Sequence, residues 1–142
     1  MTTVNIKSAR ELWAKAGIRD YDLEYTTAPA NGHYLVTVHD SEVKKVDAIQ
    51  PDGSRIELHP GAPRYYSVEG IFLTIADELA QLEKPNPFER PKGTKIIMKF
   101  KPNLKLGYPE WYHRDIMGAT ASARIDVVRL TPTIPASTTE KK

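Results

Sequence analysis

The chain has 142 residues, of which 40% are hydrophobic and 27% are charged, and its formal net charge at pH 7 is +2. This length and composition fit one globular domain, and no apolar run approaches the roughly 18 residues that a membrane-spanning helix needs. The 20 basic and 18 acidic residues balance too evenly for a charge-driven nucleic-acid partner, and without cysteine neither a disulfide nor a thiolate-bound metal centre can form.

The N-terminal element is expected to be a short helix. Ser8 and Glu11 have the spacing of a capping box, in which the serine hydroxyl accepts from the third helical amide and the glutamate reaches back to the amide of the serine. Gly17 is placed to end the helix in the left-handed conformation. The apolar side of this helix would consist of Leu12, Trp13 and Ala16.

From residue 20 the apolar period changes to two, which is typical of strands with one buried face. Two such runs, residues 20–25 and 33–39, are separated by a loop that contains Asn31 and Gly32, so we expect a hairpin. A turn then leads into residues 43–50. Pro51-Asp-Gly-Ser is a further turn signal before a short run at residues 55–58.

A second helix is predicted after Ser67, whose hydroxyl can cap it. Six apolar residues follow a helical period and form one stripe: Val68, Ile71, Phe72, Ile75, Leu79 and Leu82. Lys84-Pro-Asn-Pro would end this helix.

Three more strand-like runs cover residues 94–100, 110–116 and 123–130. In the first of these runs Lys95, Lys99 and Lys101 alternate with apolar residues, which predicts that the lysines lie on the solvent-exposed face of a strand. Residues 132–142 have no hydrophobic periodicity and few apolar side chains, which predicts a mobile tail.

The element order α-β-β-β-α-β-β-β, with short links, predicts an α+β fold: a single antiparallel sheet of about six strands with two helices packed on one face. We expect one domain over residues 1–131. The first residues lack a basic segment followed by an apolar one, so no signal peptide is expected in this sequence. The chain would be cytoplasmic, or exported with its signal removed.

Four segments resemble, in their order and spacing, the bacterial DUF6174 family. They are Leu12 and Trp13 with residues 18–25, residues 34–38, residues 67–72, and the Gly-Tyr-Pro turn at 107–109 with Asp115. The resemblance spans residues 12–131 and implies a domain of unknown function, in a family with many small exported proteins or lipoproteins. The chain departs from that pattern because it has no lipobox cysteine and no cysteine in the first hairpin. The family offers no catalytic residues to carry over.

No cofactor motif is present, and the histidines do not predict a metal site. His33 and His39 share a strand face, but six residues separate them by roughly 20 Å, far beyond one metal shell. His59 lies in a proline-rich connector. No short ligand spacing of a known metal site occurs.

Residues 107–115 contain more aromatic and titratable side chains than any other segment of comparable length. An enzyme hypothesis takes His113 as a general base oriented by Asp115, with Glu110 as a second carboxylate. No nucleophile, oxyanion loop or phosphate-binding glycine motif accompanies them. The alternative is that Trp111, His113 and Asp115 form one mixed strand face.

A second hypothesis uses aromatic side chains that could line one concave patch and bind an apolar ligand, a sugar or a peptide: Tyr65, Tyr66, Tyr108, Trp111 and Tyr112. The alternative is that these rings fill the space between the sheet and the second helix. The leading functional hypothesis is therefore a non-catalytic binding domain that holds a protein, peptide or small apolar ligand through the aromatic patch or a sheet edge. Assembly into a homo-oligomer through a sheet edge is compatible with this function and with the enzyme alternative.

Overall fold

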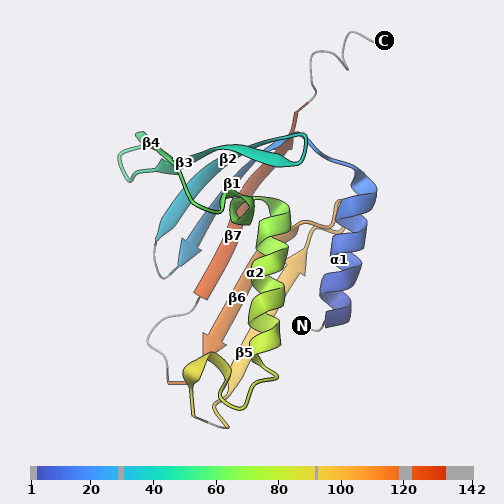
Figure 1. The fold of residues 1–142 in the computed structure, drawn as a ribbon, viewed down its shortest axis with the longest axis vertical. Helices are drawn as coiled ribbons and strands as arrows, with labels where there is room; N and C mark the ends of the chain where they lie inside the picture. Colours follow the sequence, from blue (N-terminus) through green and yellow to red (C-terminus); the bar gives the residue numbers. More distant parts are fainter. Residues whose placement is uncertain (1–2, 29–30, 92, 119–122, 134–142) are drawn as a thin grey trace.

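The computed structural model describes residues 3–28, 31–91, 93–118 and 123–133 (Figure 1). Two α-helices, α1 (Thr3–Ala16) and α2 (Val68–Gln81), accompany two short 3-10 helices, η1 (Pro63–Tyr66) and η2 (Pro87–Glu89). The strands are β1 (Tyr21–Ala28), β2 (Gly32–His39), β3 (Glu42–Ile49), β4 (Arg55–Leu58), β5 (Ile96–Pro102), β6 (Pro109–Ile116) and β7 (Ala123–Pro132).

All seven strands belong to one sheet with the order β4-β3-β2-β1-β7-β6-β5. Every neighbouring pair is antiparallel. The chain thus forms two meanders, and the pairing of the first strand with the last joins them at the centre of the sheet. The predicted α+β class with a single antiparallel sheet is confirmed, and the short run at residues 55–58 adds the edge strand β4.

Both helices pack on the same face of the sheet (Figure 1). The alternation in β1 has the predicted effect, since Tyr21, Leu23 and Tyr25 are all buried on this face. Phe72 and Ile75 of α2 meet them and are fully buried. The core is therefore the layer between the two helices and one side of the sheet, as the predicted stripe of α2 requires.

The predicted start of α1 is wrong. The helix begins at Thr3, so Ser8 lies inside it and is exposed, and the capping box with Glu11 does not mark its N-terminus. Ile6 is buried with Ala9 and Trp13. These residues lie three and four positions apart on one helical face, so burial of Ile6 extends the helix beyond the local cap signal.

The end of α1 agrees with the sequence, because Gly17 has a φ of 66° and its amide donates to the carbonyl oxygen of Ala14 over 3.2 Å. The start of α2 agrees as well. The Oγ of Ser67 accepts from the amide of Gly70 at 3.1 Å, which satisfies one of the amides that a helix N-terminus leaves without a partner.

The Gly-Tyr-Pro turn that precedes β6 serves the packing of α1. Gly107 has a φ of 90°, and a Cβ placed there would lie 2.4 Å from the carbonyl oxygen of Ala9 and 2.7 Å from the amide nitrogen of Trp13. Only glycine allows this backbone conformation and this approach together. The backbone of α1 therefore packs directly against this turn.

The last strand runs into the segment predicted as a tail. Pro132 is opposite Tyr21, and the amide of Thr133 donates to the carbonyl oxygen of Asp20 over 2.9 Å. The paired part of the chain therefore reaches residue 133, two residues beyond the predicted domain boundary. The rest of the predicted tail, residues 134–142, lies outside the described residues.

In the part of the chain that the structure describes, neither helix is long and apolar enough to cross a membrane.

Candidate functional site

The five aromatic residues expected to line one patch are distributed over both faces of the sheet. Tyr112 is buried beneath α2, whereas Trp111, the preceding residue of β6, projects from the opposite face, where it stacks on His113 with a centroid distance of 4.6 Å. Adjacent residues of a strand must point to opposite faces. Trp111 and Tyr112 therefore cannot contribute to one patch.

The other three rings lie apart from these two. Tyr108 meets Trp13 edge to face at 6.4 Å, and Tyr66 meets Tyr34 in the same way at 5.4 Å. Tyr65 lies beside the guanidinium of Arg64 and is 39% exposed. Tyr66, Tyr108 and Tyr112 thus fill space at the margin and centre of the core, which is the alternative that the sequence left open. A ligand-binding role of any single ring stays a prediction.

The carboxylate that reaches His113 comes from β7. The His113 Nε2 lies 3.1 Å from Oδ1 of Asp126. Asp115, the predicted partner, is opposite Ile97 of β5. Glu110 is held elsewhere, because its Oε2 accepts from the Asn103 side chain at 2.8 Å. The pairing of β6 with β7 thus brings Asp126 to His113, a register that the sequence does not reveal, and the predicted roles of Asp115 and Glu110 stay predictions.

Two other histidines also pair with carboxylates. The His33 Nε2 is 2.7 Å from a Glu24 oxygen, and the His39 Nδ1 is 2.7 Å from Asp20. The second Glu24 oxygen lies 3.4 Å from the Arg129 guanidinium. Within the described residues, no three or more acidic or histidine side chains gather in a way that could hold a metal ion.

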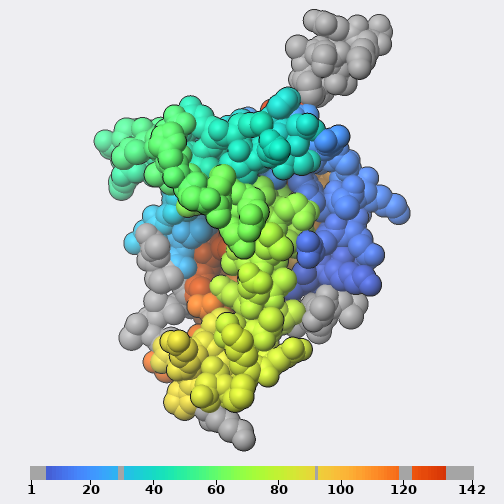
Figure 2. All heavy atoms as spheres, in the orientation of Figure 1, coloured from blue at the N-terminus to red at the C-terminus, as the bar shows by residue number. Residues whose placement is uncertain are grey.

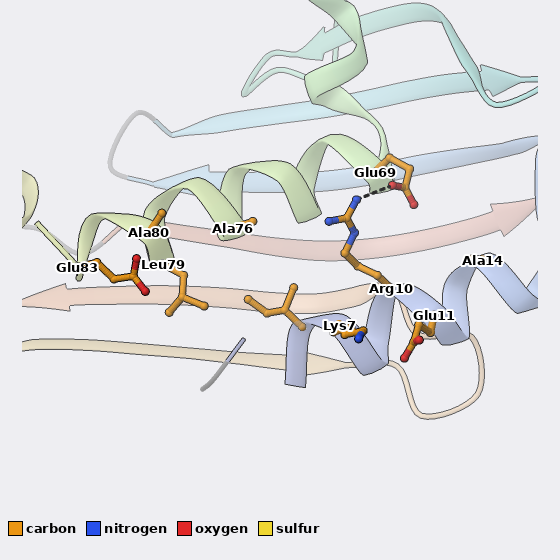
Figure 3. Close-up of a pocket in the computed structure, with 10 residues that line it drawn as sticks. Lys7, Arg10, Glu11, Ala14, Glu69, Ala76, Leu79, Ala80 and Glu83 are labelled. Atoms are coloured by element: carbon orange, nitrogen blue, oxygen red, sulfur yellow. Dashed lines mark ion pairs between the residues drawn. The ribbon is translucent and has the colours of Figure 1, made fainter. Parts of the chain in front are cut away.

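An elongated groove runs between α1 and α2, on the face of the sheet that the two helices cover. Figure 2 shows the two helices side by side on this side, and Figure 3 shows the residues that line the groove between them. Its volume is about 610 Å³. The lining is made by Ile6, Lys7, Arg10, Glu11 and Ala14 of α1 and by Glu69, Ala76, Leu79 and Ala80 of α2, with Glu83 just beyond it.

The groove exists because small residues flank the main apolar stripe of α2. Glu69, Ala76, Ala80 and Glu83 are spaced so that they lie along one line of the helix. Phe72 and Ile75 of α2 are buried in the core, Leu79 lines the groove, and the two alanines leave the space toward α1 unfilled. The groove was not predicted from the sequence, because the alanine pair beside the stripe does not indicate how far α1 lies from α2.

An ion pair joins the walls of the groove. The Arg10 guanidinium of α1 lies 3.5 Å from the Glu69 carboxylate in the first turn of α2 (Figure 3). Arg10 also lies over the ring of Phe72, 5.9 Å from its centroid. These two contacts hold α1 against the N-terminal part of α2.

A second cavity of about 640 Å³ lies at the C-terminal end of α2. Its most prominent side chain, Arg114, is held between Glu78, at 2.7 Å, and the ring of Phe88, at 4.3 Å from the centroid. Phe88 and Glu89 have φ values of 54° and 59°, a strained conformation for residues other than glycine. The lining is largely charged, so this cavity is a weaker candidate for an apolar ligand.

Buried tyrosines connect α2 to the sheet beneath the groove. The Tyr21 hydroxyl accepts from the amide of Val68 at 3.1 Å, and burial raises the pKa of Tyr21 to about 12. The Tyr112 hydroxyl donates to Glu78 at 2.5 Å. Burial, followed by the neighbouring Glu78 carboxylate, raises the pKa of Tyr112 as well. Both phenols therefore stay neutral at physiological pH and can act as fixed hydrogen-bonding groups.

Comparisons with known protein families, with curated proteins and with solved structures found no match for this chain. The resemblance to the DUF6174 family stays a prediction.

Proposed function

We propose that this protein is a non-catalytic binding domain that holds a linear apolar ligand with an acidic head group in the groove between α1 and α2. The observation that carries this function is the groove itself, about 610 Å³ in volume, with Ile6 and Leu79 between two charged rims. Small-molecule sites of proteins have volumes of about 300–1,000 Å³ and are mostly apolar with a few placed polar groups.

The shape of the groove favours a linear ligand. Its lining follows α2 from Glu69 to Glu83, and 14 residues of helix span about 21 Å. Ala76 and Ala80 make that wall shallow, so a narrow chain fits better than a bulky ring system. An apolar chain there would cover Leu79, which α1 leaves partly exposed.

The groove lining has two cations, Lys7 and Arg10, and three carboxylates, Glu11, Glu69 and Glu83, so an acidic head group would bind at Lys7. Arg10 is paired with Glu69, whereas Lys7 forms no ion pair within the described residues. The Lys7 ammonium can therefore bind a carboxylate or phosphate without breaking an existing contact. Glu83, at the far end, would repel the same group, which orients the ligand along the groove.

The sheet edges give less support to the edge-binding mode expected from the sequence. One edge strand, β4, has only four residues. The other, β5, carries Lys99 and Lys101 and ends at Pro102. Short edge strands, lysines and proline are the features with which proteins discourage pairing along an edge.

A binding series tests this function. We expect octanoate, decanoate and dodecanoate to bind with affinities that rise with chain length, since each buried methylene contributes about 0.8 kcal/mol. Isothermal titration calorimetry below the micelle concentration measures this trend. Ala80→Phe should fill the groove and weaken decanoate binding at least tenfold, whereas Ala16→Phe adds the same ring at an exposed position of α1 that does not line the groove.

Lys7→Glu should weaken decanoate and leave decanol unchanged, because only the charged head contacts residue 7. Thermal unfolding of each variant confirms that the fold is kept. Equal affinities of the two alanine variants, or affinities that do not depend on chain length, would show that the groove is not the ligand site.

The acid–base hypothesis for His113, Asp115 and Glu110 stays a prediction, and Asp126 is a further carboxylate beside His113. The two cavities described above are lined by residues that do not include His113. General acid–base catalysis requires a bound substrate within hydrogen-bonding reach. The groove therefore gives the binding function the firmer physical basis.

A further inference from the structure

The open face of the sheet carries a row of basic side chains across three strands. Lys99 of β5 is opposite His113 of β6, and His113 is opposite Arg124 of β7. Their neighbours Met98, Tyr112 and Ile125 belong to the core, so all three members of the row project away from the helices. Strands lie about 4.8 Å apart, which places these three groups within about 10 Å.

The row places two permanent cations, Lys99 and Arg124, on either side of His113 on one face of the sheet. Elsewhere on the same face the sheet uses complementary pairs, as Glu24 and Arg129 show. Within the described residues Lys99 and Arg124 form no ion pair, although His113 contacts Asp126.

Protection of the sheet edge does not explain the row. Lysine is common on edge strands such as β5 because it discourages aggregation. Arg124, however, lies on β7, which has partners on both sides at the centre of the sheet. Edge protection therefore does not account for Arg124, and no ion pair within the described residues accounts for it either.

An aromatic residue lies directly beside the row. Trp111 occupies the next outward position of β6, stacks on His113 and is opposite Lys101 on one side and Asp126 on the other. Lys95 precedes β5, and Ile97, which is 38% exposed, lies between it and Lys99 on this face. Lys101 pairs with Glu110 over 3.4 Å, and Asp115 and Asp126 also lie on this face, so Lys99 and Arg124 are the cations here that form no ion pair within the described residues.

We propose that the open face of β5, β6 and β7 binds single-stranded nucleic acid. The phosphates would contact Lys99 and Arg124, and a base would stack on Trp111. Basic side chains that follow the backbone and an aromatic platform for the bases are the two requirements for binding without sequence preference. The whole-chain charge of +2 does not exclude this site, because binding would depend on the cations of Lys99 and Arg124 and on the ring of Trp111 rather than on the net charge.

Fluorescence anisotropy with a labelled oligothymidylate of about 12 nucleotides tests the proposal at low salt. We expect binding that weakens as salt rises, and a roughly tenfold loss of affinity in Lys99→Glu and in Arg124→Glu, each with a shallower salt dependence. Trp111→Leu should also weaken binding roughly tenfold while leaving the salt dependence unchanged. Lys15→Glu is the matched control: it reverses the same charge at an exposed position of α1 and should bind as the wild type does.

Circular dichroism and thermal unfolding establish that each variant is folded. Absence of binding at low salt would overturn the proposal, as would equal losses in Lys15→Glu and Lys99→Glu. Tighter binding to heparin with no effect of Trp111→Leu would also overturn it and identify a general polyanion surface. Decanoate binding in the groove is unaffected by these outcomes, so the two sites are tested separately.

Discussion

The two faces of the sheet follow different rules. On the covered face, large apolar side chains from β1, β2 and α2 are buried together, and within the described residues no buried side-chain nitrogen or oxygen lacks a hydrogen-bond partner. The open face holds charge pairs such as Glu24 with His33 and His113 with Asp126, and also Lys99 and Arg124, which form no ion pair within the described residues. Packing explains the covered face almost completely. The open face contains residues that packing does not explain, and these are the residues to test for function.

The largest expected effect lies in the centre of the covered face. Phe72→Ala removes a fully buried ring and should lower the free energy of unfolding by about 3–5 kcal/mol, since a cavity adds to the lost transfer energy. Urea unfolding measures this difference. Leu104→Ala is the control, because Leu104 is 86% exposed and its truncation should change stability by less than about 0.5 kcal/mol. Similar losses in both variants would contradict the assignment of the core.

The next largest loss of stability is expected at the Gly107 turn, against which α1 packs. Gly107→Ala places a methyl group against the backbone of Ala9 and Trp13 and should cost about 3 kcal/mol. Gly118→Ala is closely matched, because Gly118 has a φ of 88° but no atom within 4 Å of the added methyl group. This control variant should lose only about 1 kcal/mol of unfolding free energy, because alanine is strained at a positive φ even without a steric clash. Equal costs in urea unfolding would mean that α1 does not rest on the turn.

The buried phenols predict a loss of stability at alkaline pH. Burial raises the pKa of Tyr21 to about 12, above the value near 10 of an unfolded chain. The unfolded state therefore releases the phenolic proton first, so this contribution is fully present below pH 10 and is lost as the pH rises toward 12. The slope is about 1.4 kcal/mol per pH unit for each such phenol.

Tyr21→Phe should reduce this slope by one proton in urea unfolding between pH 9 and 12 (a range set by the two pKa values). Tyr25 and Tyr112, whose pKa values burial also raises, would supply the remaining slope. If the variant and the wild type lost stability in parallel over this range, Tyr21 would not be a buried neutral phenol.

The smallest effect tests the open face directly. Lys99→Glu places a carboxylate opposite His113 and leaves Arg124 as the one lysine or arginine of the row, so it should raise the free energy of unfolding by about 0.5 kcal/mol. Most substitutions destabilise a protein, so a gain would be informative. The control Lys15→Glu, on α1, should show no comparable gain. A loss of stability in Lys99→Glu would indicate that the row serves the fold.

Much of the covered face could be predicted because its signals are local. The period of β1, the cap at Ser67 and the stripe of α2 each depend on residues within one element. The start of α1 could not be predicted from its cap signal, since burial of Ile6 outweighs the capping box at Ser8.

The sites were harder to predict because they depend on register and on the spacing of helices. Asp126 lies 13 residues beyond its partner His113, and only the pairing of β6 with β7 brings them together. The separation of Trp111 from Tyr112, by contrast, was readable, because neighbours in a strand face opposite ways. The groove depends on the distance between α1 and α2, which no local pattern encodes.

Chemical-shift mapping of decanoate on the ¹⁵N-labelled protein tests the proposed function most directly. We expect saturable shifts of the amides of Ala14, Ala76 and Ala80, along the groove, with little change at Trp111 and His113 on the open face. Shifts confined to the open face, or small non-saturating shifts across the whole molecule, would contradict the assignment of the groove as a binding site.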